Sequence, residues 1–352
     1  MQARALTTIS IAAALSLGLT GCNPPMPPEV LAALTEQTYT CEHGESSLWL
    51  PTAIADQSMG WADSMSFACE GMTLVPAVDE ASTSILVSDL AEPASTCSPY
   101  ARVPFALDAA VIAFNVDGVG NLTLTPKLAE EILSGVVTDW SDPKVAAANP
   151  GFEFTPGPIS VVAPTQENTL RSFSTWMSRL NGGSFNTGLL TPVTSTDPAE
   201  VLAIPSGGVA LVPFSHAALN FAMVAVIQTT DEAAMLANPD AVGIATAGTQ
   251  LKITKSTNRV AVELNPEAKA LAPEGIDEVP TPYQAIYSVD MSLCGDESLA
   301  TRAAARFLLR QDSQGSLGAS FMLPLPERVR VESLAEVSKG LNIVVPSDLP
   351  QE

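Results

Sequence analysis

Few residues of the chain could carry covalent chemistry. The sequence contains two histidines, His43 and His216, so a metal site with three histidine ligands is excluded. Neither a Gly-x-Ser-x-Gly nor a His-Glu-x-x-His motif occurs. Residues Ser141 to Lys144 fit the spacing Ser-x-x-Lys, but Pro143 breaks the helical turn that would set the lysine beside the serine. The sequence therefore favours a protein that binds a molecule over an enzyme.

The balance of charge excludes further classes of function. The 352 residues include 16 Lys and Arg against 38 Asp and Glu, which gives a net charge of −22. Nucleic acids and anionic lipid surfaces are held by clustered lysine and arginine, so we expect neither nucleic-acid binding nor electrostatic adhesion to a membrane. A small anion stays possible, because backbone dipoles can hold one inside an acidic protein.

The first residues resemble a bacterial export signal. Arg4 precedes a short apolar stretch at 9–19, which ends in Leu19-Thr20-Gly21-Cys22. This pattern predicts a lipoprotein signal peptide at 1–21, with acylation of Cys22 and a Pro-rich tether at 22–37. The alternative is an ordinary signal peptide that happens to end in cysteine. The lipid-anchor interpretation places the protein at the cell membrane, on its extracytoplasmic face.

Four cysteines are left after Cys22. An even number in an exported protein favours two disulfides, for which three connectivities are possible. We favour the pairs Cys41–Cys69 and Cys97–Cys294, and no cysteine or histidine spacing is typical of zinc.

Alternating strand and helix patterns position these residues and predict an α/β fold with mixed sheets and flanking helices. We expect a turn at 44–47, from which a helix runs towards Cys69, and an irregular polar segment at 228–279. The remaining strands are expected at 38–41, 72–78, 85–87, 103–115, 159–162, 209–212, 223–228 and 283–289, and helices at 126–134, 170–180 and 299–309.

One block of motifs is specific. The apolar segment ending in Asn115 is followed by Leu122-Thr123-Leu124, then by Ile132 and Gly135, then by Asp139-Trp140 and by Asn149-Pro150-Gly151. This order resembles the phosphate-binding receptors of bacterial phosphate ABC importers. The segments 207–215 and 321–326 extend the resemblance, which covers most of the chain from about Ser84 onward.

The resemblance implies a two-lobed, type II periplasmic-binding-protein-like fold. Lobe 1 would comprise 38–110 plus 283–352, and lobe 2 would comprise 111–282. A small-molecule ligand would be clamped between the lobes and delivered to ABC permease subunits, with no cofactor and no metal.

The resemblance also implies a set of ligand-binding residues. Asp89 lies where the family has an aspartate that accepts a hydrogen bond from protonated phosphate, although it could instead cap a helix. Arg171 could replace a lost cation or form a surface salt bridge. The full expected set is Ser46, Ser47, Ser88, Asp89, Thr165, Asn168, Thr169 and Arg171.

The ligand loop departs from the family pattern. Ala163 and Pro164 stand where the family has arginine, and Glu167 stands where a serine would donate to the anion. We therefore carry two hypotheses. The first is a membrane-anchored solute-binding lipoprotein, with phosphate as the ligand by resemblance. The second is a receptor-derived protein that has lost phosphate binding and serves as an envelope interaction or signalling module.

Overall fold

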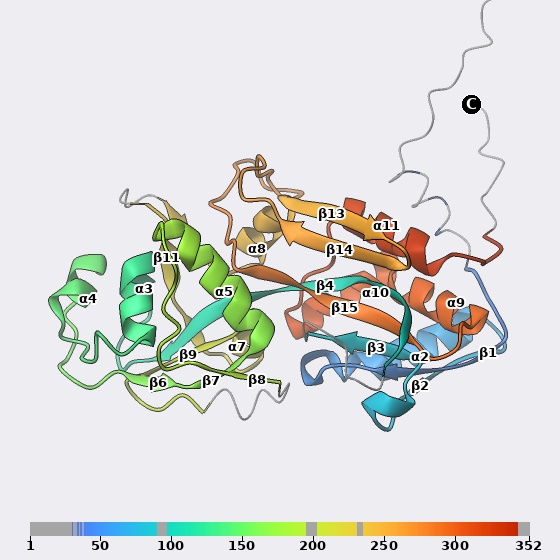
Figure 1. Ribbon diagram of the computed structural model, residues 1–352, viewed down its shortest axis with the longest axis horizontal. Coiled ribbons are helices and arrows are strands. Elements are labelled where there is room, and N and C mark those ends of the chain that lie inside the picture. Colours follow the sequence, from blue (N-terminus) through green and yellow to red (C-terminus); the bar gives the residue numbers. More distant parts are fainter. Residues whose placement is uncertain are drawn as a thin grey trace, which may run out of the picture.

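The computed structural model describes residues 30, 34, 36, 39–89, 97–194, 203–230 and 235–343. The predicted signal peptide and Cys22 lie outside these residues. Figure 1 shows an elongated molecule of two halves, joined by long strands that run from one half into the other. In the described part of the chain, no helix is both long and apolar enough to span a bilayer.

The strand β4 (Pro99–Asn115) forms the axis of the molecule. Its first part pairs antiparallel with β15 (Ile286–Cys294), and its last six residues pair antiparallel with β9 (Gly208–Pro213). Side chains from Ala101 to Phe114 are all buried, which explains why this segment is almost continuously apolar. One strand therefore contributes to the core of both halves.

The first half holds the larger part of the main sheet. Its strands follow the order β13-β14-β4-β15-β3-β1-β2. Besides β4 and β15, these are β1 (Gly44–Trp49), β2 (Met72–Pro76), β3 (Ile85–Ser88), β13 (Leu251–Ser256) and β14 (Arg259–Leu264). The helices of this half are α2 (Gln57–Ala68), α9 (Leu299–Leu308), α10 (Gln311–Gly315) and α11 (Glu327–Val337), with short 3₁₀ turns η1 (Thr52–Ile54), η2 (Glu80–Ser82) and η3 (Ser316–Ser320).

The second half is built on the far end of β4 (Figure 1). Here β9 and β10 (Met223–Val224) pair with β4, and β6 (Ser160–Val162) pairs with β9. Two small sheets complete it: β5 (Thr123–Leu124) with β11 (Val226–Gln228) and β12 (Leu236–Ala237), and β7 (Pro164–Gln166) with β8 (Thr191–Val193). Its helices are α3 (Pro126–Leu133), α4 (Pro143–Ala148), α5 (Glu167–Leu180) and α7 (Phe214–Leu219); α8 (Ala241–Gly248) contacts β4 and β15.

Local signals explain the elements that the sequence predicts well. The helix expected at 126–134 is α3, which begins with proline in its first turn. The hydroxyl of Thr125 accepts a hydrogen bond from the Leu128 N–H at 3.1 Å and caps this helix. The helices expected at 170–180 and 299–309 are α5 and α9, and α5 begins three residues earlier than expected.

Three expectations about local structure are wrong. Residues 44–47 belong to β1 instead of a turn, because they pair in register with β2, and the helix expected near Leu48 is α2, which begins only at Gln57. Residues 39–43 form no strand. The segment 228–279 contains β12, α8 and the β13–β14 hairpin.

The disulfide pairing is confirmed. Cys41 is bonded to Cys69 and Cys97 to Cys294, with Cα–Cα distances of 5.3 and 5.2 Å. The division into lobes at 110 and 282 stays a prediction. Within the expected lobe 2, β14 pairs with β4 at Arg102, which lies in the expected lobe 1.

Candidate functional site

Asp89 is the most unusual of the expected ligand residues. It follows β3 directly and is 4% exposed. Its Oδ1 atom is buried and has no hydrogen-bond partner among the described residues. Burial raises the pKa of this carboxyl to about 6, and the charge of Glu80 raises it further, against the hydrogen bond from the Gln166 side chain. A buried acceptor without a partner is costly unless another group satisfies it.

The N-terminus of α5 lies beside Asp89. The side-chain amide of Asn168 donates a hydrogen bond to the Asp89 carbonyl oxygen. Gln166 occupies the N-cap position of α5 without capping it through its side chain. Just before the helix, the Thr165 hydroxyl donates to the Leu211 carbonyl oxygen at 2.8 Å and fixes this segment to β9. The positive end of the α5 dipole is therefore held close to the buried carboxylate.

A second buried carboxylate, Asp108, adjoins the first. It lies on β4, accepts hydrogen bonds from the Ser215 hydroxyl at 2.5 Å and from the Ala109 N–H at 2.7 Å, and is 1% exposed. Burial raises the pKa of Asp108 to about 7, and the charge of Asp89 adds to the increase. The two carboxylates are thus near enough for the charge of Asp89 to disfavour ionisation of Asp108.

Tyr287 of β15 completes the arrangement. Its hydroxyl lies 3.3 Å from the Thr169 hydroxyl of α5. Burial raises the pKa of Tyr287 well above its ordinary value, and the charges of Asp108 and Asp89 raise it further. These contacts define what we call the Asp89 cluster, which consists of Asp89, Asp108, Gln166, Thr169, Ser215 and Tyr287.

The Asp89 cluster combines one unpaired carboxylate oxygen with hydroxyl, amide and helix N-terminal donors. Such a set suits an oxyanion that still carries a proton, because the proton can be donated to the carboxylate while the other oxygens accept hydrogen bonds. A fully ionised oxyanion would meet only repulsion at the same carboxylate. The described residues contain no group of three or more His, Cys, Asp or Glu side chains placed to hold a metal ion.

The structure brings part of the expected ligand set together. Asn168 bonds to Asp89, and Thr169 contacts the cluster directly, while Thr165 is held on β9 beside it. Ser88 ends β3 and pairs in register with Asp290. These four residues therefore lie around or next to Asp89, and their role as ligands stays a prediction.

Ser46 and Ser47 do not join this group. The Ser46 hydroxyl lies 3.4 Å from the Thr301 hydroxyl, and the Ser47 N–H donates to the Ser84 hydroxyl at 2.8 Å. Ser84 precedes Asp89 by five residues of extended chain, or roughly 16 Å. The two serines therefore lie at the opposite end of β3 from Asp89.

Arg171 forms the salt bridge that the sequence offered as its alternative role. Its guanidinium lies 2.6 Å from the Glu167 carboxylate, and both side chains are about half exposed. The pair neutralises the negative charge that Glu167 would otherwise add near the N-terminus of α5.

Four members of the cluster were not among the expected ligands. The sequence could have indicated Asp108 as a site residue, since it is the one charged residue in the apolar segment 103–115. Gln166, Ser215 and Tyr287 gave none, because their role depends on how α5, α7 and β15 meet β4.

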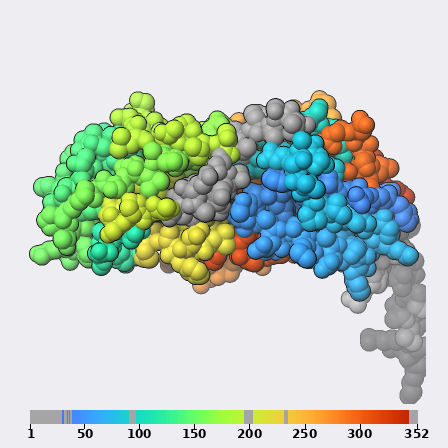
Figure 2. Space-filling model, turned by 90° about the horizontal axis from the view of Figure 1, so that it is seen from below, coloured from blue at the N-terminus to red at the C-terminus, as the bar shows by residue number. Residues whose placement is uncertain are grey.

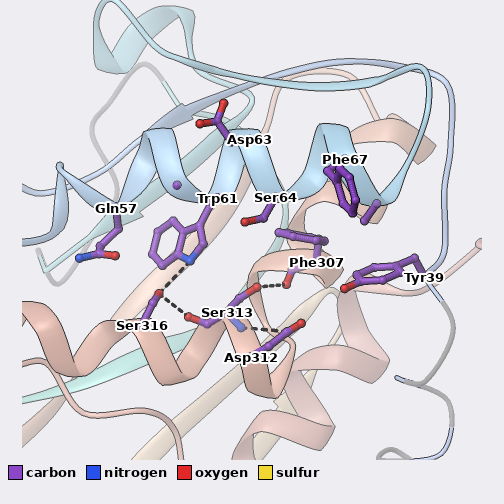
Figure 3. A pocket seen from close by; sticks show the side chains of 12 residues that line it. Tyr39, Gln57, Trp61, Asp63, Ser64, Phe67, Phe307, Asp312, Ser313 and Ser316 are labelled. Carbon is purple, nitrogen blue, oxygen red and sulfur yellow. Dashed lines mark hydrogen bonds between the residues drawn. The ribbon is translucent and has the colours of Figure 1, made fainter.

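Several cavities are present in the described part of the chain. One of about 590 Å³ lies between α5, β14 and β15 and adjoins the cluster: Tyr287, Asn168 and Arg171 line it, whereas Asp89, Thr165 and Thr169 do not. A larger one of about 770 Å³ lies between α2 and α10 (Figure 3). Trp61 donates from Nε1 to the Ser316 hydroxyl at 2.9 Å. Aromatic rings line this cavity, from Tyr39, Trp61, Phe67 and Phe307.

Comparisons with known proteins agree with this architecture. The sequence profile of the PBP superfamily domain matches residues 77–301. The phosphate-binding protein PstS 2 of Mycobacterium tuberculosis is 29% identical over 92 residues, which is 26% of this chain and 25% of that protein. The phosphate-binding protein PstS 3 of Mycobacterium leprae is 27% identical over 89 residues, which is 25% of this chain and 24% of that protein. The match thus spans about a quarter of the length of these relatives.

Solved structures share the fold at low sequence identity. The crystal structure of a DING protein is 14% identical, with a TM-score of 0.56, and the match covers 86% of this chain and 97% of that one. A phosphate-binding protein from Stenotrophomonas maltophilia is 15% identical, with a TM-score of 0.51, and the match covers 84% of this chain and 93% of that one. From the profile match over residues 77–301 and this shared two-lobed fold, the chain belongs to the PBP superfamily.

Proposed function

We propose that this protein is a solute-binding receptor that captures phosphate at the Asp89 cluster and presents it to an ABC importer. The observation that carries the proposal is the buried Oδ1 atom of Asp89, which has no partner among the described residues and lies beside the N-terminus of α5. Monohydrogen phosphate supplies both a proton for that oxygen and charged oxygens for the helix N-terminus.

Two further observations support phosphate. The relatives from M. tuberculosis and S. maltophilia are phosphate-binding proteins by name. The negative charge of Glu167, which would oppose an anion at the α5 N-terminus, is neutralised by Arg171. Positions 163–164 lack the arginine that the family has, but the carboxylate of Glu167 is paired and so adds no further repulsion of the anion.

Binding requires access to a cluster that is buried in this structure. Opening of the two halves about β4 and β15, the strands that carry Asp108 and Tyr287, would admit the ligand. Closure would then return Asn168 to the Asp89 carbonyl oxygen and remove the anion from water. Each hydrogen bond to the anion is worth more in the low dielectric of the closed site than in water.

Isothermal titration with phosphate and sulfate tests the proposal. We expect phosphate to bind and sulfate, which carries no proton at neutral pH, to bind at least about tenfold more weakly. Asp89→Asn should weaken phosphate binding by about tenfold or more, because Asn cannot accept the same charge-assisted hydrogen bond. The exposed Asp277→Asn is the matched control and should leave binding unchanged.

Equal affinity of Asp89→Asn and the parent protein for phosphate would overturn the site assignment. Absence of binding by phosphate would favour the second hypothesis, a receptor-derived envelope interaction or signalling module. The loop that lacks arginine at 163–164 is the feature that favours that alternative.

The location of the receptor is part of the proposal. Acylation of Cys22 after removal of 1–21 would anchor it at the extracytoplasmic face of the cell membrane, with 22–37 as the tether. Cys22→Ser should release the protein from the membrane fraction, and mass spectrometry of the parent protein should show the acyl groups. Retention of the serine variant in the membrane fraction would contradict the anchor.

A further inference from the structure

The 590 Å³ cavity between the halves is lined by an unusual number of cations. Four of the 16 basic residues of the chain line it: Arg102, Arg171, Arg179 and Arg259. We call it the arginine groove. One wall is formed by α5 and the other by β14, and residues of β4, of β15 and just before β15 complete the lining. Because the protein has a net charge of −22, four arginine side chains around one cavity are unexpected.

Ion pairs account for two of the four arginines. Arg102 lies 3.0 Å from the Asp290 carboxylate, and Arg171 lies 2.6 Å from Glu167. Arg179 donates to the neutral side chain of Gln284. In the described part of the chain, neither Arg179 nor Arg259 forms a salt bridge, and one further carboxylate, Glu263, lines the groove.

The two arginines without ion pairs lie at opposite ends of the groove. Arg259 pairs in register with Arg102, whose guanidinium bonds to Asp290. Arg179 bonds to Gln284, six residues before Asp290 on the chain, which is roughly 20 Å of extended backbone. On the opposite wall, Arg171 and Arg179 are eight helical residues apart, or about 12 Å along α5. The positive groups are thus spread along the groove.

Between its ends the groove offers uncharged polar and apolar groups. Ser172, Thr175 and Ser288 contribute hydroxyls, and Trp176 and Ile286 contribute apolar surface. Hydroxyl groups alternating with apolar surface suit the body of a sugar or polyol. The volume is also far larger than one inorganic phosphate needs.

We propose that the arginine groove binds an elongated organic anion with a phosphate group at each end, of the sugar bisphosphate class. One phosphate would contact Arg259, and the other would contact Arg179. The proposal does not rest on phosphate binding at the Asp89 cluster, because the arginines that carry it lie outside that cluster, although Tyr287 of the cluster and Asn168 also line the groove.

Isothermal titration with fructose bisphosphate, whose phosphates are on its two terminal carbons, tests this site. Glucose phosphate, with one terminal phosphate, and inorganic phosphate serve as shorter probes. We expect fructose bisphosphate to bind at least about tenfold more tightly than glucose phosphate, since each guanidinium–phosphate contact adds a charge-assisted hydrogen bond. Arg259→Gln and Arg179→Gln should each weaken its binding by about tenfold, and both should keep the melting temperature of the parent protein within a few degrees.

Two controls separate the groove from the Asp89 cluster and from general charge. Lys144→Ala removes one positive charge from α4, at the far end of the second half, and should leave binding unchanged (Figure 1). Asp89→Asn should weaken phosphate binding but not fructose bisphosphate binding. The proposal is wrong if fructose bisphosphate gives no binding heat, if both arginine variants bind it as tightly as the parent, or if Asp89→Asn abolishes its binding.

Discussion

At the scale of single residues, the molecule keeps two carboxylates in surroundings that disfavour their charge. Asp108 is stabilised by three hydrogen bonds, from the Ser215 hydroxyl, the Ser215 N–H and the Ala109 N–H, and yet burial still dominates its pKa. Asp89 has fewer partners and a pKa of about 6. Both residues therefore contribute to the way in which the stability of the protein depends on pH near neutrality.

The pKa of Asp108 gives a prediction with a definite sign. Its folded value of about 7 lies above the unfolded value of about 3.9, so the folded state binds the proton more tightly. This contribution to the free energy of unfolding is complete below about pH 4 and is lost as pH rises to about 7, by at most about 1.4 kcal/mol per pH unit. In urea unfolding, Asp108→Asn should therefore become more stable relative to the parent between pH 5 and roughly pH 7.

The exposed Asp277→Asn again provides the control, because it removes a carboxylate from the surface and leaves the buried ones in place. A constant difference between Asp108→Asn and the parent at every pH would contradict the buried, protonated state of Asp108. Asp89→Asn should show the same trend over a lower range, which ends near pH 6.

At the scale of elements, agreement between sequence and structure follows the range of the signal. The apolar run of β4 and the helical periodicity of α3, α5 and α9 are local, and all four elements lie close to where the sequence predicts them. The strand β1 carries two serines, and it pairs with β2 and β3 from more distant parts of the chain. Its pairing depends on non-local contacts that no local pattern reveals.

The β13–β14 hairpin has a local sequence pattern typical of paired strands, although we expected an irregular segment there. Its strands alternate apolar and polar residues, as at Leu251 and Ile253, and its two-residue turn ends in Asn258 with φ of 59°. Asparagine tolerates this conformation and is favoured in such turns. The polar residues of β13 made the segment resemble a loop, although they belong to an edge strand of the sheet.

The residues of the candidate site also divide into those that a local sequence pattern indicates and those that depend on non-local contacts. Asp89, Asn168 and Thr169 lie where strands and helices end, which sequence patterns can indicate. Tyr287 is the second residue of β15, and only the crossing of α5 over that strand brings its hydroxyl to Thr169. The same crossing of α5 over β15 also forms part of the arginine groove. Neither the contact between Tyr287 and Thr169 nor the groove could therefore be predicted from the spacing of residues in the sequence.

The turn directly before β9 depends on one glycine. Gly207 has φ of 75°, its carbonyl oxygen accepts a hydrogen bond from Trp140 Nε1 at 3.0 Å, and an added Cβ would lie 2.9 Å from the Pro158 carbonyl oxygen. Gly207→Ala should therefore cost about 1–2 kcal/mol more in free energy of unfolding than Gly118→Ala. Gly118 has the same backbone conformation, with φ of 76°, but open space around the added atom.

Chemical denaturation of both variants measures this difference. The shared left-handed backbone conformation should cost each variant about 1–2 kcal/mol, so that the excess for Gly207→Ala reports the contact with Pro158 alone. Equal destabilisation of the two variants would show that the turn can shift by a few tenths of an ångström without cost.

At the scale of the whole molecule, β4 and β15 link everything described above. Figure 2 shows the blue first half and the green and yellow second half at opposite ends of one elongated molecule. Asp108 and Tyr287 lie on the strands that run between them, and β4 pairs with partners in both halves. A motion that opens the halves must therefore bend at the strands that carry the cluster.

The two disulfides restrain this assembly to different extents. Cys41–Cys69 closes a sequence separation of 28 residues within the first half. Cys97–Cys294 closes 197 residues and joins the start of β4 to the end of β15, so that the loop includes the entire second half. If loop closure in the unfolded chain dominates, the longer loop should contribute about 1.7 kcal/mol more to the free energy of unfolding.

Removing each disulfide separately checks this expectation. The paired substitutions Cys41→Ala with Cys69→Ala, and Cys97→Ala with Cys294→Ala, should both lower the free energy of unfolding measured in urea, and the second pair should lower it more. The reason is that the unfolded chain without Cys97–Cys294 regains the freedom to separate two strands that are adjacent only in the fold. A larger loss from the Cys41–Cys69 pair would mean that local packing around α2, rather than restraint of the unfolded chain, sets the value of these bonds.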